Sequence, residues 1–272
     1  MTTKYIVQHL AFSLLALGTA SSVFAADALG YTDTPIIPGT KWHVHDPDRP
    51  RPKVVTPAKT FSHLAPAPSD AVVLFDGTDL SKWEGGGGKP AGWTLMDGFM
   101  QVAPKSGSIH TKQRFADFQL HLEFATPAEV KGNSQGRGNS GVLMNGIYEV
   151  QILDNYNNLT YPDGQCGALY GQTPPLANAC KPPGEWQSYD IIFESPRWDA
   201  DGKIAKKANV TVIQNGILLH HKREYAGTTP HRNNGNYDKP HAPEVYIELQ
   251  DHNNPMRFRN IWVRSIGEYD KP

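Results

Sequence analysis

The sequence predicts an all-β protein in which two antiparallel sheets pack as a sandwich or jelly roll. Three observations support this fold class. Apolar and polar residues alternate in most segments after residue 71, which is the period of a half-buried strand. Turn-forming pairs such as Asp76-Gly77 and Asn215-Gly216 separate these segments. A helical period is missing nearly everywhere, and many short strands joined by turns are typical of sandwiches and jelly rolls.

The first 25 residues predict a secretory signal peptide rather than part of the fold. Lys4 supplies a positive charge, 11–17 is a short apolar core, and Val23-Phe24-Ala25 has the small-x-small pattern of a cleavage site. We expect cleavage near Ala25 and export to the periplasm or beyond, the alternative being an uncleaved anchor. No other stretch is apolar for long enough to cross a bilayer.

Residues 26–70 predict an extended, proline-rich arm. Prolines recur from Pro35 to Pro68, and no strand or helix of normal length fits between them. Such a segment is either a linker or an arm lying on the domain, and Trp42 favours the arm because a free linker has little use for tryptophan. His43 and His45 have the spacing of part of a metal site, with ordinary packing or solvent contact as the alternative.

Residues 71–267 form the expected β domain, whose length suits a single sandwich. The alternation and the turn signals predict strands at 72–75, 93–95, 99–102, 118–124, 148–152, 189–194, 210–212, 217–219, 245–250 and 258–263. Long loops remain at 132–139, 155–186 and 226–243, and loops of that size are usually functional or disordered.

The segment from Gly136 to Asp154 is the best candidate for a functional site. It begins as a glycine-rich polar loop and ends as an alternating strand. In that strand Glu149 and Gln151 share one face, and the apolar side chains of residues 148, 150 and 152 share the other. A polar row backed by a packed apolar row suits a binding groove.

Further polar rows are His121 with Glu123, and Glu248 with Gln250 and His252; the run from Gln250 to Asn254 also contains Asp251. On a shared concave face these rows would form a groove of carboxylates, amides and imidazoles, which hydrogen-bond sugar hydroxyls well. The alternative is the solvated outer face that every sandwich has.

Single residues add weaker signals. Arg137 and Asn139 lie between glycines, which let the backbone approach a ligand closely, although a structural turn is equally consistent. Trp186, Trp93 and Tyr170 could each stack on a sugar ring, with a core position as the alternative for each tryptophan.

The net charge of the chain narrows the class of partner. The chain carries 26 basic and 27 acidic residues, and removal of Lys4 with the signal peptide leaves 25 and 27, a net charge of −2. This gives no electrostatic reason to expect nucleic acid or anionic membrane as a partner.

In an exported protein Cys166 and Cys180 are expected to form a disulfide, with two free thiols as the alternative.

At this point the chain resembles the 3-keto-disaccharide hydrolase family over about residues 72–264. The resemblance rests on several segments in order: LFDGTDLSKW at 74–83, GNSGV at 138–142, YEVQILD at 148–154, GEWQ at 184–187, LQDH at 249–252 and FRNI at 258–261. It implies a concanavalin-A-like jelly roll that cleaves glycosides oxidised at C3 of the sugar.

The implied chemistry is an elimination followed by hydration, which needs a base, an acid and a donor to the keto oxygen. We infer Glu149 as base or acid with His252 as its partner, and Asp154 as a catalytic-site group that orients or ligates. Gln151 and Arg137 are the expected donors. Further substrate contacts are assigned to Asn139, Glu123, Trp186, Gln250 and Asp251. A calcium or other divalent ion could polarise the ketone, but no ligand cluster in the sequence is convincing.

Two other functions remain open at this stage. The same groove would serve a non-catalytic carbohydrate-binding, lectin-like module. The pattern Glu149-x-Gln151-x-x-Asp154 also resembles the strand of laminarinase-type glycosidases, which need two carboxylates facing the scissile bond. Gln151 replaces the middle acid, and Asp154 has the wrong parity without a bulge, so the sequence disfavours this alternative.

Overall fold

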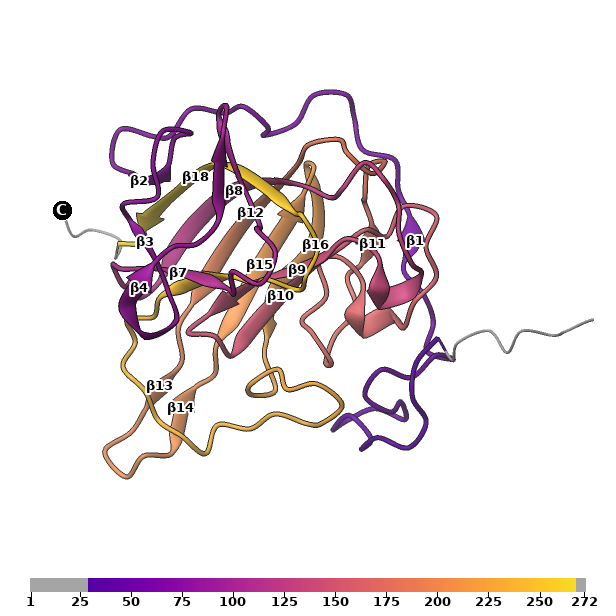
Figure 1. Cartoon of the computed structure of the whole chain (residues 1–272). Helices are drawn as coiled ribbons and strands as arrows, with labels where there is room; N and C mark the ends of the chain where they lie inside the picture. Colours follow the sequence, from indigo (N-terminus) through magenta and orange to yellow (C-terminus); the bar gives the residue numbers. More distant parts are fainter. Residues whose placement is uncertain (1–28, 268–272) are drawn as a thin grey trace, which may run out of the picture.

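The computed structural model describes residues 29–267, so the predicted signal peptide at 1–25 lies outside the described residues and stays a prediction. The predicted all-β class is confirmed: antiparallel sheets stack face to face, and the helical elements among the described residues are short 3₁₀ turns (Figure 1). These turns are η1 (Gly86–Gly88), η2 (Ser134–Gly136) and η3 (Pro162–Gly164).

The larger sheet is eight-stranded and forms one layer of the sandwich. Its order is β16 (Ile217–Glu224), β15 (Asn209–Gln214), β12 (Gln187–Glu194), β8 (Phe118–Ala125), β18 (Arg257–Ser265), β6 (Phe99–Gln101) and β5 (Thr94–Met96), with β2 (Val72–Phe75) paired to β18. The predicted Asn215-Gly216 turn joins β15 to β16, and both residues have the positive φ values, 51° and 79°, that a tight hairpin requires.

The smaller sheet is six-stranded and carries the candidate site. Its order is β10 (Tyr148–Leu153), β9 (Asn139–Met144), β17 (Ile247–Leu249), β7 (Ile109–Thr111), β3 (Trp83–Gly85) and β4 (Lys89–Pro90). Two minor pairs complete the fold: β1 (Lys53–Val54) with β11 (Ala177–Asn178), and β13 (Arg197–Trp198) with β14 (Ile204–Lys206).

The core lies between the two sheets and is built from one face of each strand. On β8 the side chains of Phe118, Leu120 and Leu122 are fully buried, and on β10 Val150 and Ile152 are as well. Each such side chain contributes roughly 1.5–3 kcal/mol by leaving water. The core face of β10 leaves its alternate residues pointing away from the core, and these include Glu149 and Gln151.

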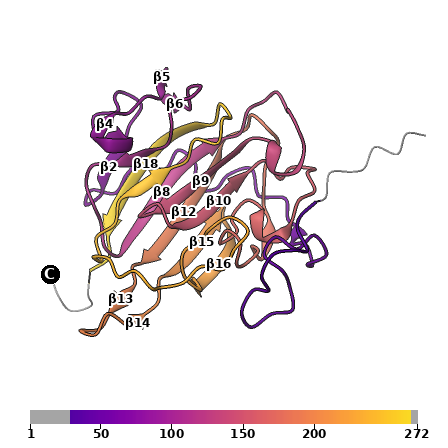
Figure 2. The ribbon, with the colours of Figure 1, turned by 60° about the horizontal axis from the view of Figure 1, so that its bottom comes forward.

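The proline-rich arm lies on the sandwich and follows its outside from the loops beside β11 to β2 (Figures 1 and 2). Its β1 strand pairs in parallel with β11. Farther along, the Leu64 amide donates to Glu123 Oε1 at 2.5 Å, and Ser62 Oγ donates to Asp190 Oδ2 at 2.5 Å. The arm therefore covers the outer face of the larger sheet.

The cysteine prediction needs a correction. Cys166 and Cys180 are buried free thiols in the structure, not a disulfide. Both sulfurs lie near one amide nitrogen, Gln214 Nε2, at 3.5 and 3.6 Å. Each thiol also has a separate contact, with the Tyr189 hydroxyl for Cys166 and the Leu153 carbonyl for Cys180. Hydrogen bonding and packing therefore hold this loop instead of a covalent bridge.

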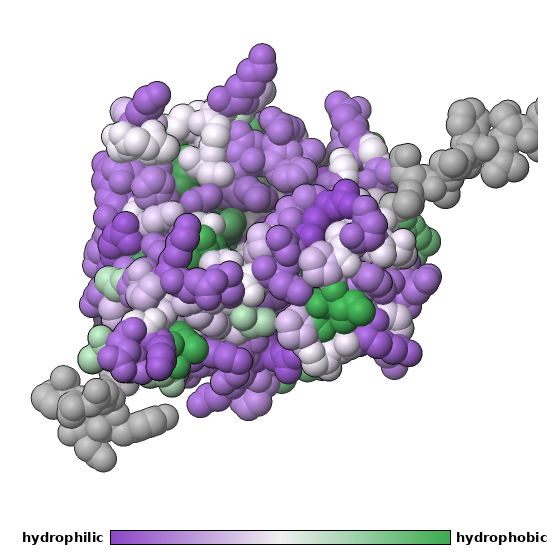
Figure 3. All heavy atoms as spheres, turned by 90° about the horizontal axis from the view of Figure 1, so that it is seen from below, coloured by the Kyte–Doolittle hydropathy of each residue, from purple (hydrophilic) through white to green (hydrophobic). Residues whose placement is uncertain are grey.

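The surface at the end that carries the β13–β14 hairpin is mostly hydrophilic, with small separate apolar patches (Figure 3). Among the described residues, no helix has the length and apolar character needed to span a membrane.

Candidate functional site

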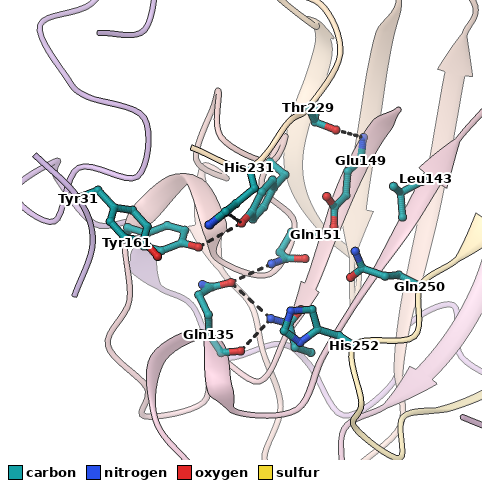
Figure 4. Close-up of a pocket in the computed structure, with 12 residues that line it drawn as sticks. Tyr31, Gln135, Leu143, Glu149, Gln151, Tyr161, Thr229, His231, Gln250 and His252 are labelled. Carbon is teal, nitrogen blue, oxygen red and sulfur yellow. Dashed lines mark hydrogen bonds between the residues drawn. The ribbon is translucent and has the colours of Figure 1, made fainter. Parts of the chain in front are cut away.

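A pocket of about 350 Å³ lies on the face of the six-stranded sheet that points away from the core (Figure 4). Strands β9 and β10 and the segment after β17 form its floor, and loops and the arm form its walls. The lining residues are Tyr31, Gln135, Asn139, Leu143, Glu149, Gln151, Tyr161, Tyr170, Thr229, His231, Gln250 and His252.

Glu149 is the carboxylic acid of the pocket floor. Its residue is only 5% exposed, and its backbone amide bonds the Thr229 hydroxyl oxygen at 3.2 Å. Burial, and secondarily the negative charge of Glu248, raise the pKa of Glu149 to about 8. The side chain is therefore mostly protonated at neutral pH, which is the state a general acid needs.

Amide side chains surround Glu149 on the floor. Gln135 Oε1 accepts from Gln151 Nε2 at 3.1 Å, and the Gln135 carbonyl accepts from Asn139 Nδ2 at 2.9 Å. No group within residues 29–267 donates to the buried oxygens Asn139 Oδ1 and Gln151 Oε1. Buried acceptors are normally paired, so these two oxygens are ready to receive hydroxyl donors from a ligand.

Histidines approach the pocket from two sides. Tyr170 Oη lies 2.9 Å from His231 Nδ1, which fixes this ring at the pocket wall. Burial lowers the pKa of His231, and the neighbouring charges of His45, Arg232 and His252 lower it further. His231 is therefore neutral at neutral pH and can accept a proton. His252 lines the opposite side of the pocket (Figure 4).

A neutral carboxylic acid and a neutral imidazole in one pocket form an acid and base pair. Their environments shift the two pKa values in opposite directions, upward for Glu149 and downward for His231. Such divergent shifts are the usual sign of assigned acid and base roles.

The structure brings together Glu149, Gln151, Asn139, Gln250 and His252, all of which the sequence analysis had named. The alternation in β10 predicted Glu149 and Gln151, the polar run after β17 predicted Gln250 and His252, and the flanking glycines pointed to Asn139. The strand register brings them together, because Glu149 lies opposite Leu143 of β9 and Leu143 lies opposite Glu248 of β17.

Arg137 and Asp154 do not line the pocket and instead pair with each other. Arg137 Nε and Nη2 both donate to Asp154 Oδ2, at 2.9 and 2.5 Å, and both residues are buried. The Asp154 amide also bonds the Gly138 carbonyl at 2.8 Å. This pair ties the glycine-rich loop to the end of β10, so the Arg137 guanidinium is already engaged and does not face a substrate.

Glu123, Trp186 and Asp251 also lie outside the pocket lining. Glu123 is on β8 of the other sheet and bonds Arg259 at 2.7 Å. The Trp186 ring packs under the Arg259 guanidinium, 4.1 Å away. Asp251 accepts from the Gly107 amide at 2.9 Å and so anchors the loop that carries His252.

Several lining residues were not predicted as site residues. Tyr31 comes from the arm, Tyr161 from the loop at 155–186, and Thr229 and His231 from the loop at 226–243. The only available signal was the length of these loops, because no periodic pattern orients a side chain in an irregular segment.

Within the described residues, no group of three or more His, Cys, Asp or Glu side chains is arranged to hold a metal ion. His45 is fully buried against Tyr161 and Asp163.

Comparison with known proteins supports a glycoside hydrolase-like function. The chain is 47% identical to a proposed glycosyl hydrolase from Parabacteroides distasonis ATCC 8503, over 80% of this chain and 93% of that one, with a TM-score of 0.73. A second such protein from the same organism shares the fold at 20% identity, over 73% of this chain and 94% of that one, with a TM-score of 0.54.

No protein of curated function matches the sequence. The sequence model of one family, however, matches residues 70–264, which is most of the chain and all of the sandwich strands except the end of β18. The chain therefore belongs to the 3-keto-alpha-glucoside-1,2-lyase-like domain family.

Proposed function

We propose that this glycoside hydrolase-like protein cleaves glycosides oxidised at C3 of the sugar, by elimination of the aglycone followed by addition of water. The observation that carries the proposal is the protonated Glu149 in a pocket that also holds histidines and unpaired amide oxygens. The description of the family, a 1,2-lyase acting on 3-keto-alpha-glucosides, supports the same chemistry.

The number of carboxylates in the pocket favours elimination over ordinary glycoside hydrolysis. Ordinary glycosidases use two carboxylates that flank the scissile bond. Glu149 is the one carboxylate among the pocket-lining residues, and Asp154 is held by Arg137 outside the lining. Glu248 shares the sheet face with Glu149 and acts on its charge, but it too lies outside the lining. A single acid with an imidazole base is sufficient when a ketone has already acidified the neighbouring C–H bond.

In the proposed mechanism His231 removes the proton at C2, which is acidic because C3 is a ketone. The electron pair forms an enolate, which then expels the leaving group at C1 and leaves a double bond between C1 and C2. Glu149 donates its proton to the departing oxygen. Water then adds at C1 and gives a proton to the Glu149 carboxylate, which restores the acid. His231, whose proton exchanges with solvent after the aglycone leaves, protonates C2 and so yields the free 3-keto sugar. His252, across the pocket, is the alternative base.

The amides supply recognition. Asn139 Oδ1 and Gln151 Oε1 accept from sugar hydroxyls, and the Gln250 amide, which points into the pocket, is placed to donate to the keto oxygen (Figure 4). A pocket of this small volume, lined mostly by polar and aromatic side chains, fits one sugar ring and part of an aglycone.

The test is incubation of the protein with a 3-keto-glucoside and, separately, with its unoxidised parent. We expect aglycone release from the keto compound alone. In D₂O the released 3-keto sugar should carry deuterium at C2, beyond the exchange seen without protein, because elimination breaks that C–H bond. Release without deuterium at C2 contradicts elimination, and saturable binding without release supports a carbohydrate-binding module instead.

Substitution of the acid tests the site. Glu149→Gln should lower turnover by at least ~100-fold, the contribution typical of a general acid or base. The matched control is Glu244→Gln, which changes an exposed glutamate outside the pocket and should leave turnover unchanged. Undiminished turnover in Glu149→Gln removes Glu149 from the mechanism.

A further inference from the structure

One end of the pocket is aromatic, in contrast to its amide-rich floor. Tyr31, Tyr161 and His231 lie at this end (Figure 4), and Tyr170 bonds Tyr161 and His231 there; we name these four residues the aromatic wall. The Tyr31 ring meets the His231 ring nearly edge-on, at 5.8 Å between centroids and 81° between planes. The ring centroids of Tyr31 and Tyr161 are 6.2 Å apart. These rings come from three separate segments of the chain, so the wall exists only in the folded protein.

The polar atoms of the aromatic wall largely bond one another. The hydroxyls of Tyr161 and Tyr170 are 3.2 Å apart, and the Tyr170 hydroxyl is 2.9 Å from His231 Nδ1. Burial raises the pKa of both tyrosines, so these hydroxyls stay protonated. The Tyr161 and Tyr170 hydroxyls are therefore already engaged, and these residues offer their ring carbons to a ligand. Such a surface suits an aromatic ring better than a second sugar, which would need partners for its own hydroxyls.

Tyr31 is held firmly although it belongs to the arm. Its amide donates to the His45 carbonyl at 2.8 Å, and the Arg232 guanidinium stacks over its ring at 4.1 Å. Arg232 Nη2 also donates to both oxygens of Asp33, each at 2.7 Å. The preceding Gly30 permits this turn, because a Cβ there would come within 2.1 Å of the His45 carbonyl.

Of the aromatic wall, Tyr31 is the residue that lies outside the family domain. The family match begins at residue 70, whereas Tyr31 and its contacts with Gly30 and His45 belong to the arm, and Arg232 of the domain holds the ring from the other side. The domain alone would leave this end of the pocket without Tyr31. The arm therefore completes the site rather than only covering the sandwich.

We propose that the arm, through Tyr31, completes a subsite in which the aromatic wall binds an aromatic ring carried by the aglycone. The amide floor binds the sugar, so a substituent on C1 that reaches the other end of the pocket meets the wall. The position of the scissile bond rests on the proposed function, but the preference for an aromatic ring can be measured by binding alone.

The experiment is calorimetric titration of the full protein with phenyl and methyl glucosides, as both anomers. These unoxidised compounds lack the ketone and are not substrates of the proposed reaction. We expect the phenyl glucoside to bind about 3- to 10-fold more tightly, as an aromatic contact provides. Tyr31→Ala should abolish that preference, and Tyr31→Phe should keep it because the ring remains.

The matched control is Tyr156→Ala, which removes a half-exposed tyrosine outside the pocket and should preserve the preference. A glucose disaccharide is the further probe. If it binds as tightly as the phenyl glucoside in a Tyr31-dependent way, the subsite holds a second sugar and the proposal is wrong. Equal binding of phenyl and methyl glucosides also overturns it. Turnover of the 3-keto compounds is assayed separately, so failure of that reaction leaves the binding result interpretable.

Discussion

A single buried carboxyl group, Glu149, links the fold to the proposed chemistry. Its side chain is protonated in the folded protein to about pH 8, whereas an unfolded glutamate titrates near 4.5. Between these two values the unfolded chain loses its proton and the folded chain does not. The raised pKa therefore lowers stability as the pH rises through this window, by up to about 5 kcal/mol.

The first prediction compares the wild type with Glu149→Gln, which keeps the neutral form at every pH. The two proteins should have similar free energies of unfolding near pH 4.5. As the pH rises to about 8, the free energy of unfolding of the variant should increasingly exceed that of the wild type. Urea unfolding at pH 5, 7 and 9 measures the difference. Parallel pH dependences would show that Glu149 is not buried as described.

The second prediction concerns Glu248, whose negative charge helps to raise the pKa of Glu149. With Glu149 as the acid, kcat/KM should fall above about pH 8 as this group ionises. Glu248→Gln removes the charge, so the alkaline limb should move to lower pH while the acid limb, assigned to His231, stays in place. The exposed Glu244→Gln is the control. An alkaline limb that does not respond to Glu248→Gln assigns that limb to another group.

At the scale of the element, the pairing of β9 with β10 fixes where the acid lies. Gly141 pairs with Gln151, and a Cβ at position 141 would stand 2.3 Å from Glu149 Oε1. The third prediction is therefore that Gly141→Ala displaces the carboxyl group and lowers kcat by about 10- to 100-fold, a typical cost of misplacing a catalytic group. Gly85→Ala, at a buried strand glycine of the same sheet with its nearest neighbour at 3.5 Å, should retain activity. Full activity in Gly141→Ala contradicts this placement.

The strands also explain how far the sequence could predict the site. In β10 the period of two correctly separates Glu149 and Gln151 from the core residues, because one face of the strand must be buried. The same pattern in β8 suggested that Glu123 contacts a substrate. In the structure the arm buries that polar face of β8 instead of leaving it open to a ligand. Tyr31 and His231 belong to irregular segments whose positions depend on contacts distant in sequence, such as Arg232 with Asp33.

At the scale of the whole molecule, the arm joins the two sheets. It is attached at one end to the pocket by Tyr31 and near its other end to the outer face of the larger sheet by Glu123. Burial alone would raise the pKa of Glu123, but hydrogen bonds from His121, Asn260, the Leu64 amide and Arg259 outweigh it and lower the pKa to about 2. The ionised carboxylate therefore stabilises the fold together with the attached arm.

The fourth prediction follows from that lowered pKa. Stability from Glu123 is present above pH 4.5, where an unfolded glutamate is ionised, and is lost as the pH falls toward 2. Glu123→Gln should therefore cost about 3 kcal/mol at pH 7 and almost nothing near pH 2. Because the Leu64 contact is weakened, trypsin should also cut faster after the exposed Lys59 of the arm. Glu129→Gln, at a glutamate whose side chain is 78% exposed, is the control for both measurements. A pH-independent loss of stability, or an unchanged cleavage rate at Lys59, would show that the ionised Glu123 does not hold the arm on the sheet.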